Sequence, residues 1–336
     1  MSAMLDVLSC GPGVTVQDLG RSGYLAQGLS RGGAMDRLAL HEGAALLGQP
    51  VGAALEMAGF GGRFRANAPL RIALTGAPMR ASVDGTALVW HASHSVPAGA
   101  VLEIGGATAG VYGYLSIGGG LAEPEILGSQ SAHLTAGLGR ALAAGDSLAL
   151  GADTGKETGL VLDVAPRWEG GALRILPSLQ TAVFPKGERA RFCAERFARD
   201  QRGNRMGVRL VPEGAGFGLA AGQTILSEVI VPGDIQIPGD GFPYILMAEC
   251  QTTGGYPRIG TVIPADLPRV AQTAPGVAVS FRFVTREEAL AAEASYRNDI
   301  KALRKRMRPL VRDPHDIRDL LSYTLISGVT AGRELS

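Results

Sequence analysis

The stretch from Glu249 to Arg258 carries the richest set of polar side chains in the sequence, which reads Glu-Cys-Gln-Thr-Thr-Gly-Gly-Tyr-Pro-Arg. It offers an amide, two hydroxyls, a phenol and a guanidinium, while the paired glycines let the backbone approach a ligand and expose its N–H groups. Such donors suit a carbonyl, a carboxylate or a phosphate. We therefore predict a ligand-binding loop, with a long hairpin turn as the alternative. The candidate residues are Gln251, Thr252, Thr253, Gly254, Gly255, Tyr256 and Arg258.

A second polar, glycine-rich zone covers residues 14–21 and 32–36. An ion pair between Asp18 and Arg21 is able to position an anion or a partner loop. The same pair is equally well explained as an internal contact of a structural turn. The candidate binding residues of this zone are Gln17, Asp18, Arg21 and Asp36.

Several common catalytic patterns are missing from the sequence. It contains no Walker motif, no dinucleotide-binding glycine fingerprint and no Gly-x-Ser-x-Gly nucleophile elbow. The five histidines lie outside any cluster of carboxylates or cysteines, so no metal site is expected. None of the four lysines is flanked by methionines, so the chain carries no biotin-attachment motif of its own.

Composition excludes further classes of function. The net charge of +1 argues against electrostatic binding of nucleic acid or of an acidic membrane. No apolar run approaches the ~18 residues that span a bilayer, and the first residues lack the features of a signal peptide. The three cysteines are odd in number and far apart, which fits free thiols in a reducing compartment. We therefore expect a cytoplasmic protein.

The elements that must position these residues are mostly strands. The 48 glycines recur between short apolar runs, which predicts many tight turns. Asp84-Gly85 marks a hairpin, and turns lead into alternating strands at 101–104, 147–150 and 277–284. The repeated turn-and-strand units indicate two related β-barrels.

Helices are few in this prediction. Asp36 is a candidate N-cap for a helix through Leu47, with Gly48 ending it. Thr285 and Glu288 form a capping box for a charged helix to about Met307, and a further short helix is expected after residue 313. An arginine within the turn 203–207 is expected to hold that loop in place.

The length of 336 residues suggests two domains, since ~150 residues is typical of one. The segment 151–171 is polar and glycine-bearing, as a linker is. We predict a first barrel at 1–155, a second at 165–285 and a helical C-terminal extension at 286–336.

Motifs spread over the chain together resemble those of one known family. They lie at 13–24, 33–36, 55–56, 128–131, 204–207 and 233–238, and the most specific is Gln-Thr-Thr-Gly-Gly-Tyr-Pro at 251–257. The family is that of the C-type 5-oxoprolinase subunits, also called allophanate hydrolase subunit 2 or the biotin-dependent carboxyltransferase family. The resemblance covers roughly residues 5–285.

The resemblance implies a mainly β fold of two cyclophilin-like barrels, and work with companion subunits of the B and A types. It implies ATP-dependent opening of 5-oxoproline, a lactam, to glutamate. ATP is the implied cofactor, bound on or shared with a partner subunit. The donors around the carbonyl would come from the loop 251–256 and Arg258, with Gln17, Asp18, Arg21, Asp36 and Gln236 binding substrate.

Two other functions stay open. Relatives in the family are the carboxyltransferase parts of urea carboxylases, where biotin would have to arrive on another chain and the substrate is a urea-like amide. A non-catalytic regulatory subunit is the third possibility. The sequence departs from the family where Gln130 and Cys250 replace arginines, which weakens the hold on an anion. The apolar stretch within the tail 313–336 is expected to dock onto a barrel or a partner.

Overall fold

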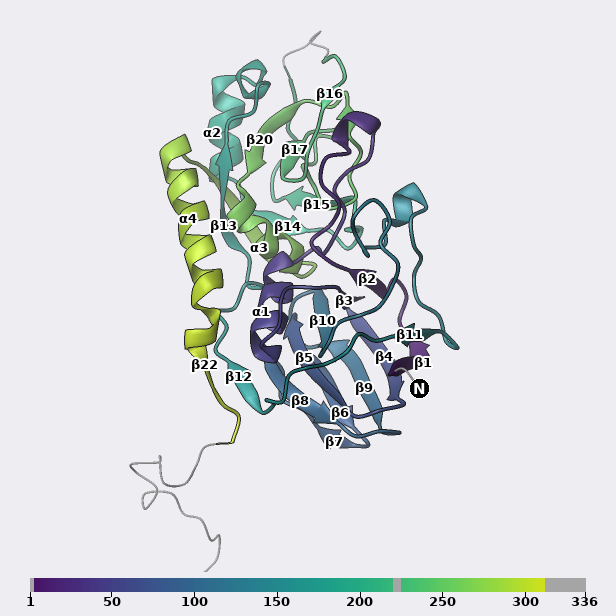
Figure 1. Cartoon of the computed structure of the whole chain (residues 1–336). Helices are drawn as coiled ribbons and strands as arrows, with labels where there is room; N and C mark the ends of the chain where they lie inside the picture. The colour runs from purple at the N-terminus through teal and green to yellow at the C-terminus, as the bar shows by residue number, and fades with distance from the viewer. Residues whose placement is uncertain (1–2, 220–224, 312–336) are drawn as a thin grey trace, which may run out of the picture.

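The computed structural model describes residues 3–219 and 225–311, and its elements are mostly strands (Figure 1). The mainly β class predicted from the sequence is therefore confirmed. The predicted tail 313–336 lies outside the described residues, and the division of the chain at residues 155 and 165 stays a prediction.

The first half of the chain folds into two sheets around one apolar core. The first sheet has the strand order β11 (Ser147–Ala149), β1 (Met4–Cys10), β4 (Phe60–Ala66), β9 (Val101–Ala107), β6 (Met79–Val83) and β7 (Thr86–Ala87). The second has the order β2 (Thr15–Gln17), β3 (Ala54–Ala58), β10 (Tyr112–Ile117), β5 (Leu70–Gly76), β8 (Ala92–Val96), β12 (Leu160–Leu162) and β22 (Met307–Pro309). Asp84-Gly85 joins β6 to β7, as the hairpin prediction expected.

The strand β5 is buried along its whole length because both of its faces are covered. Side chains of a strand alternate between the two faces of the sheet. Ile72 and Leu74 therefore enter the core between the sheets, whereas Ala73 packs under the helix α1 (Arg37–Leu47). The helix begins at Asp36, whose carboxylate accepts a hydrogen bond from the Ala39 N–H, and ends at Gly48 with a φ of 66°. Both caps are those that the sequence predicts.

The second half forms a closed barrel. Its strands follow the order β13 (Gly171–Leu176), β20 (Arg258–Val262), β17 (Asp234–Gln236), β18 (Tyr244–Leu246), β15 (Gly207–Pro212), β14 (Phe197–Arg199) and β21 (Ala278–Phe283). The parallel pair β13 and β21 closes it. A short ladder of β16 (Glu228–Val229) and β19 (Thr253–Gly254) lies beside the barrel. Two helices belong to this half, α2 (Lys186–Ala194) and α3 (Leu267–Gln272).

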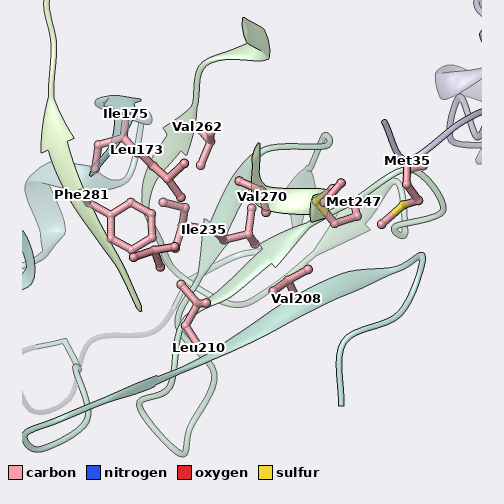
Figure 2. Close-up of a cluster of buried hydrophobic side chains, with 14 of the residues drawn as sticks. Met35, Leu173, Ile175, Val208, Leu210, Ile235, Met247, Val262, Val270 and Phe281 are labelled. Atoms are coloured by element: carbon pink, nitrogen blue, oxygen red, sulfur yellow. The ribbon is translucent and has the colours of Figure 1, made fainter. Parts of the chain in front are cut away.

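The barrel core continues into the first half without a break. Figure 2 shows its side chains, with Phe281 and Leu173 at one end and Met247 next to Met35 at the other. Met35 precedes α1, so it belongs to the first half of the chain. The two halves consequently share apolar burial as well as polar contacts.

The C-terminal part of the described chain crosses both halves. The helix α4 (Arg286–Ala302) begins with the predicted capping box of Thr285 and Glu288 and runs beside the barrel toward α1 (Figure 1). It ends earlier than expected, because a 3-10 turn (Leu303–Arg306) leads into β22. Since β12 offers a free edge, the chain becomes extended and pairs with it.

Four other 3-10 turns complete the described elements, at Leu25–Gln27, Leu134–Ala136, Thr181–Val183 and Pro264–Asp266. Within residues 3–219 and 225–311, no helix has the length and apolar character that crossing a membrane requires.

Candidate functional site

A cleft of about 450 Å³ opens on the barrel beside β15, β17 and β18. We call it the barrel cleft. It combines apolar walls with a few polar groups, which is typical of small-molecule sites. Its lining consists of Arg202, Asn204, Met206, Gly207, Ile230, Gln236, Pro238, Asp240, Tyr244, Leu246, Cys250, Gln251 and Tyr256.

Gln236 supplies the buried donor of this cleft. On β17, Ile235 points into the barrel core, so its neighbour Gln236 faces the opposite side. The Gln236 side chain lines the cleft with 7% of the residue exposed, and its Nε2 has no acceptor among the described residues. A buried donor without a partner is costly unless a ligand or water satisfies it. We therefore regard this amide as the group most ready to bind a carbonyl oxygen.

Gly254 makes room for that amide. A Cβ added at Gly254 would lie 2.6 Å from the Gln236 Nε2, which is closer than real contacts allow. Neither Gly254 nor Gly255 has a positive φ, so the backbone does not itself demand glycine at either position. The sequence predicts that Gly254 lets a ligand approach the backbone closely. In the structure its lack of a side chain instead leaves space for the Gln236 amide.

Gln251 and Tyr256 form part of the exposed rim, and 54% of Tyr256 is accessible. Beneath them, Cys250 packs against Ile230 and Leu246. Burial, followed by the nearby charge of Asp234, raises the pKa of the Cys250 thiol to about 12. The thiol is therefore neutral at ordinary pH and forms part of the apolar wall of the cleft.

Of the two threonines of the predicted loop, Thr253 lies in the ladder beside the cleft and Thr252 directly precedes it, and neither lines the cleft. The Thr252 carbonyl accepts a hydrogen bond from the Ile230 N–H, and Thr253 pairs with Val229 in the ladder of β16 and β19. Gly255 faces Ser227. The backbone of this segment holds the ladder that flanks the site.

Arg258 is occupied in the barrel wall and does not line the cleft. Its guanidinium forms ion pairs with Glu228 and with Asp234, the latter at 3.0 Å, and donates to the Val229 carbonyl. Its own N–H donates to the Gln180 side chain at 2.9 Å. We predicted a donor for substrate here, but the structure gives every one of these contacts to the protein itself.

The N-terminal zone holds a loop in place. Asp18 accepts hydrogen bonds from Ser129, Ser131 and the Gln130 N–H. Burial alone would raise the pKa of Asp18, but these hydrogen bonds, led by those of the two serines, lower it below its ordinary value. Gln130 donates through Nε2 to the carbonyls of Leu121 and Glu123.

Gln17 and Arg21 serve the same loop. The Gln17 amide donates to the Ala132 carbonyl at 3.1 Å. Arg21 donates to the carbonyls of Ile126 and Ser131, so it holds the loop and forms no ion pair with Asp18. Of the two explanations left open for this zone, the structural turn is the one that the geometry supports. None of these residues lines the barrel cleft.

Asp36 is fully buried at the joint between the two halves. Its Oδ2 accepts from the Nε of Arg167 at 2.6 Å and from the amide of Gln272 at 2.8 Å. Together with its capping of α1, these contacts leave it no access to a substrate.

Arg205 crosses the same joint directly behind the cleft. Its guanidinium pairs with Glu56 and Glu249 and donates to the Gly33 carbonyl at 2.7 Å. The prediction that this arginine holds a loop is confirmed. Its neighbours Asn204 and Met206 line the cleft, a role that the sequence analysis missed; their place within the motif 204–207 was the available signal.

Comparison with known proteins gives a consistent result. The model of the "Carboxyltransferase domain, subdomain A and B" family matches residues 27–283. The chain is 35% identical to the C-type 5-oxoprolinase subunit of Haemophilus influenzae, covering 88% of this chain and 96% of that protein. It is 33% identical to the C-type 5-oxoprolinase subunit of Escherichia coli, covering 86% and 94%. A putative urea carboxylase of Emericella nidulans is 28% identical, but the chain covers 25% of that protein.

Solved structures show the same relationship. The protein TTHA0988 is 33% identical with a TM-score of 0.76, and the match covers 84% of this chain and 56% of that one. The urea carboxylase of Kluyveromyces lactis shares the fold, with a TM-score of 0.80 at 24% identity, covering 93% of this chain and 31% of that one. The chain thus spans 56% of the first of these two solved chains and 31% of the second.

Proposed function

Since the chain belongs to the family defined by the carboxyltransferase domain with subdomains A and B, we propose that it acts as one subunit of an ATP-dependent 5-oxoprolinase. The support is the similarity to two proteins named as the C-type subunit of 5-oxoprolinase, which the chain matches over 94–96% of their length. A match of that extent favours the 5-oxoprolinase function over that of the urea carboxylase, of which the chain covers 25%.

The proposal extends to companion subunits of the B and A types and to the cytoplasm as the site of action. Cys10, Cys193 and Cys250 are free thiols, which is consistent with a reducing compartment.

The barrel cleft is the proposed substrate site, and the observation that carries this assignment is the unpartnered amide of Gln236. An N–H donor aimed at a lactam carbonyl stabilises the negative charge that develops on its oxygen. Tyr256 at the rim offers a hydroxyl, and Gln251 offers a second amide. The Cys250 thiol, which is neutral at ordinary pH, adds no charge to this part of the cleft.

A lactam carbonyl is stabilised by resonance and is a poor electrophile. ATP, when bound, supplies the phosphoryl group that activates the carbonyl oxygen, and we place its site on a companion subunit or at a shared surface. Two molecules of water are then consumed, the C–N bond breaks, and the products are glutamate, ADP and phosphate. The part of this chain is to bind the lactam and orient its oxygen through Gln236.

The test is ATP-dependent release of glutamate from 5-oxoproline by this chain co-expressed with its B-type and A-type companions, with each subunit omitted in turn. We expect turnover that vanishes when this chain alone is left out. Turnover that persists without it would disprove the catalytic role.

Carboxyl transfer is the second candidate, favoured by the similarity to a putative urea carboxylase. The same cleft would then bind a urea-like amide, and carboxybiotin would arrive on another chain. A folded complex without glutamate release, but with consumption of carboxybiotin in the presence of urea, would support this function. A folded complex inactive in both assays would favour a regulatory subunit.

A further inference from the structure

A second, smaller cavity of about 100 Å³ lies where α4 approaches the start of α1 and the segment before α3. We call it the α4 pocket; the residues used below are Met35, Met247, Leu267, Arg37, Glu293 and Tyr296. Met35 and Met247 are neighbours at the edge of the barrel core in Figure 2, and both form part of the apolar wall of the α4 pocket. It shares no residue with the barrel cleft.

Arg37 brings a positive charge to this pocket, and no described residue forms an ion pair with it. Its guanidinium takes part in no hydrogen bond or ion pair within residues 3–219 and 225–311. Burial, followed by repulsion from Arg31, lowers its pKa to about 10. Arg37 is also the first residue of α1, where the helix dipole disfavours a cation. An anion beside this guanidinium would offset the cost of its burial, the repulsion from Arg31 and the unfavourable helix dipole.

Glu293, on the other side of the pocket, leaves an oxygen free. Its Oε1 accepts from the Nε of Arg297 at 3.0 Å, whereas its Oε2 is buried and receives no hydrogen bond from any described residue. Tyr296, one turn further along α4, has a hydroxyl that forms no hydrogen bond within the described chain. Glu293 and Arg37 attract each other across the pocket but form no ion pair. The pocket therefore presents a cation on one side and a free acceptor on the other.

We propose that the α4 pocket binds a small molecule that carries both a carboxylate and an N–H group, such as an α-amino acid or its lactam. The carboxylate lies against Arg37, where a guanidinium is able to donate two parallel hydrogen bonds. The N–H group donates to the Oε2 of Glu293. The methionines and Leu267 contact the carbon skeleton, and the small volume excludes a nucleotide or a peptide.

The site itself is inferred from groups outside the barrel cleft, whereas the choice of an amino acid or its lactam as the ligand rests on the proposed function. A ligand held between α1, the barrel and α4 touches all three parts of the chain, so its binding stabilises their arrangement. The experiment must therefore separate binding here from binding in the barrel cleft.

The test is titration calorimetry on the full chain with 5-oxo-L-proline and with L-glutamate, which distinguishes a lactam from a free amino acid. Two ligands serve as controls: 2-pyrrolidinone lacks the carboxylate, and N-methyl-5-oxo-L-proline lacks the N–H group. We expect one of the two acids to bind and both controls to bind at least about tenfold more weakly, since each loses a hydrogen bond to a charged group. Failure of both acids to bind would overturn the proposal.

Variants then locate the binding. Arg37→Gln should weaken it by at least about tenfold, as expected for loss of a charge-assisted contact, and Tyr296→Phe provides a milder change should Arg37→Gln fold poorly. Arg286→Gln, on an exposed arginine of the same helix α4, should leave binding unchanged. Arg297→Gln breaks the ion pair of Glu293 without removing a lining residue and should not abolish binding.

Two outcomes separate this inference from the proposed function. Binding that weakens with Gln236→Leu but not with Arg37→Gln overturns the α4 pocket and leaves the oxoprolinase role intact. Binding that weakens with Arg37→Gln, in a chain whose complexes release no glutamate, upholds the pocket without that role.

Discussion

The amide nitrogen of Gln272 donates a hydrogen bond of 2.8 Å to the Oδ2 of Asp36, although 236 residues separate the two in the sequence. Both side chains are fully buried. The Gln272 Oε1 accepts from the N–H groups of Val111 and Tyr112. One glutamine of the barrel half thereby satisfies polar groups before α1 and at the start of β10, and the joint depends on it.

Gln236, unlike Gln272, has a side-chain amide nitrogen without a hydrogen-bond partner in the described part of the chain. Substitution by leucine should therefore have opposite effects on stability at the two glutamines. Gln272→Leu leaves several buried groups without partners at about 1–3 kcal/mol each, so we expect the free energy of unfolding to fall by about 3 kcal/mol or more. Gln236→Leu removes a donor that has no partner, so stability should hold or rise. Turnover should fall by about 10²-fold, as for loss of one oxyanion donor. Urea denaturation and glutamate release measure the two effects.

Gly254→Ala tests the space reserved for the Gln236 amide. Because its Cβ would lie 2.6 Å from Nε2, we expect the amide to be displaced and turnover to fall by about tenfold or more, since small displacements of a positioning group reduce rates steeply. Gly255→Ala is the matched control, because its Cβ would lie 3.2 Å from the Ser227 hydroxyl, which is able to rotate away. Equal activities of the two variants would contradict this role for Gly254.

Arg258→Ala and Tyr256→Phe separate scaffold from site. Removing the Arg258 guanidinium leaves the buried Asp234 without its ion pair, which typically costs about 3–5 kcal/mol. We therefore expect a large drop in melting temperature. Tyr256→Phe changes an exposed rim residue, so the melting temperature should stay within about 1 °C while KM or kcat changes. A stable Arg258→Ala variant that lacks activity would contradict this structural role and indicate that Arg258 takes part in catalysis.

His91 predicts a pH dependence of stability. Its Nε2 lies 2.9 Å from the Gly76 carbonyl oxygen, its ring stacks on Trp168, and burial lowers its pKa from 6.5 to about 4. The unfolded chain therefore takes up a proton at higher pH than the folded chain does. Stability from this group is complete above pH 6.5 and is lost as the pH falls toward about 4.

His91→Asn removes this titration and suits the positive φ of 55° at the position. Between pH 7 and pH 4.5, we expect the wild-type chain to lose about 2 kcal/mol more stability than the variant. Guanidinium denaturation at the two pH values measures the difference, and parallel losses in both proteins would refute the assignment to His91.

The sequence predicts well what depends on neighbours along the chain. The caps of α1, the capping box of α4 and the hairpin at residues 84–85 each follow from a few adjacent residues. Gln251 and Tyr256 lie on the cleft because a polar loop after a barrel strand reaches the rim.

Contacts between distant segments were beyond that reasoning. In the sequence Arg258 has no visible partner, but in the fold it forms ion pairs with Glu228 and Asp234. Asp36 likewise looks available for a ligand in the sequence, but in the fold it is buried by its contacts with Arg167 and Gln272. Nothing in the local pattern encodes such pairings, since they exist only after the barrel forms. The charged run before Met307 likewise predicts a helix up to that residue. In the structure α4 ends at Ala302, and residues 307–309 pair with the open edge of β12 instead.

The pairing of β22 with β12 has a consequence for synthesis of the chain on the ribosome. The outermost strand of the second sheet comes from residues 307–309, so this sheet stays incomplete until the whole barrel half and α4 have been translated. The nascent first half therefore presents an unpaired edge at β12, and β12 can recruit a wrong strand during that interval. Chains that stall before residue 307 should aggregate or require a chaperone, whereas chains that include residues 307–309 protect the edge with β22.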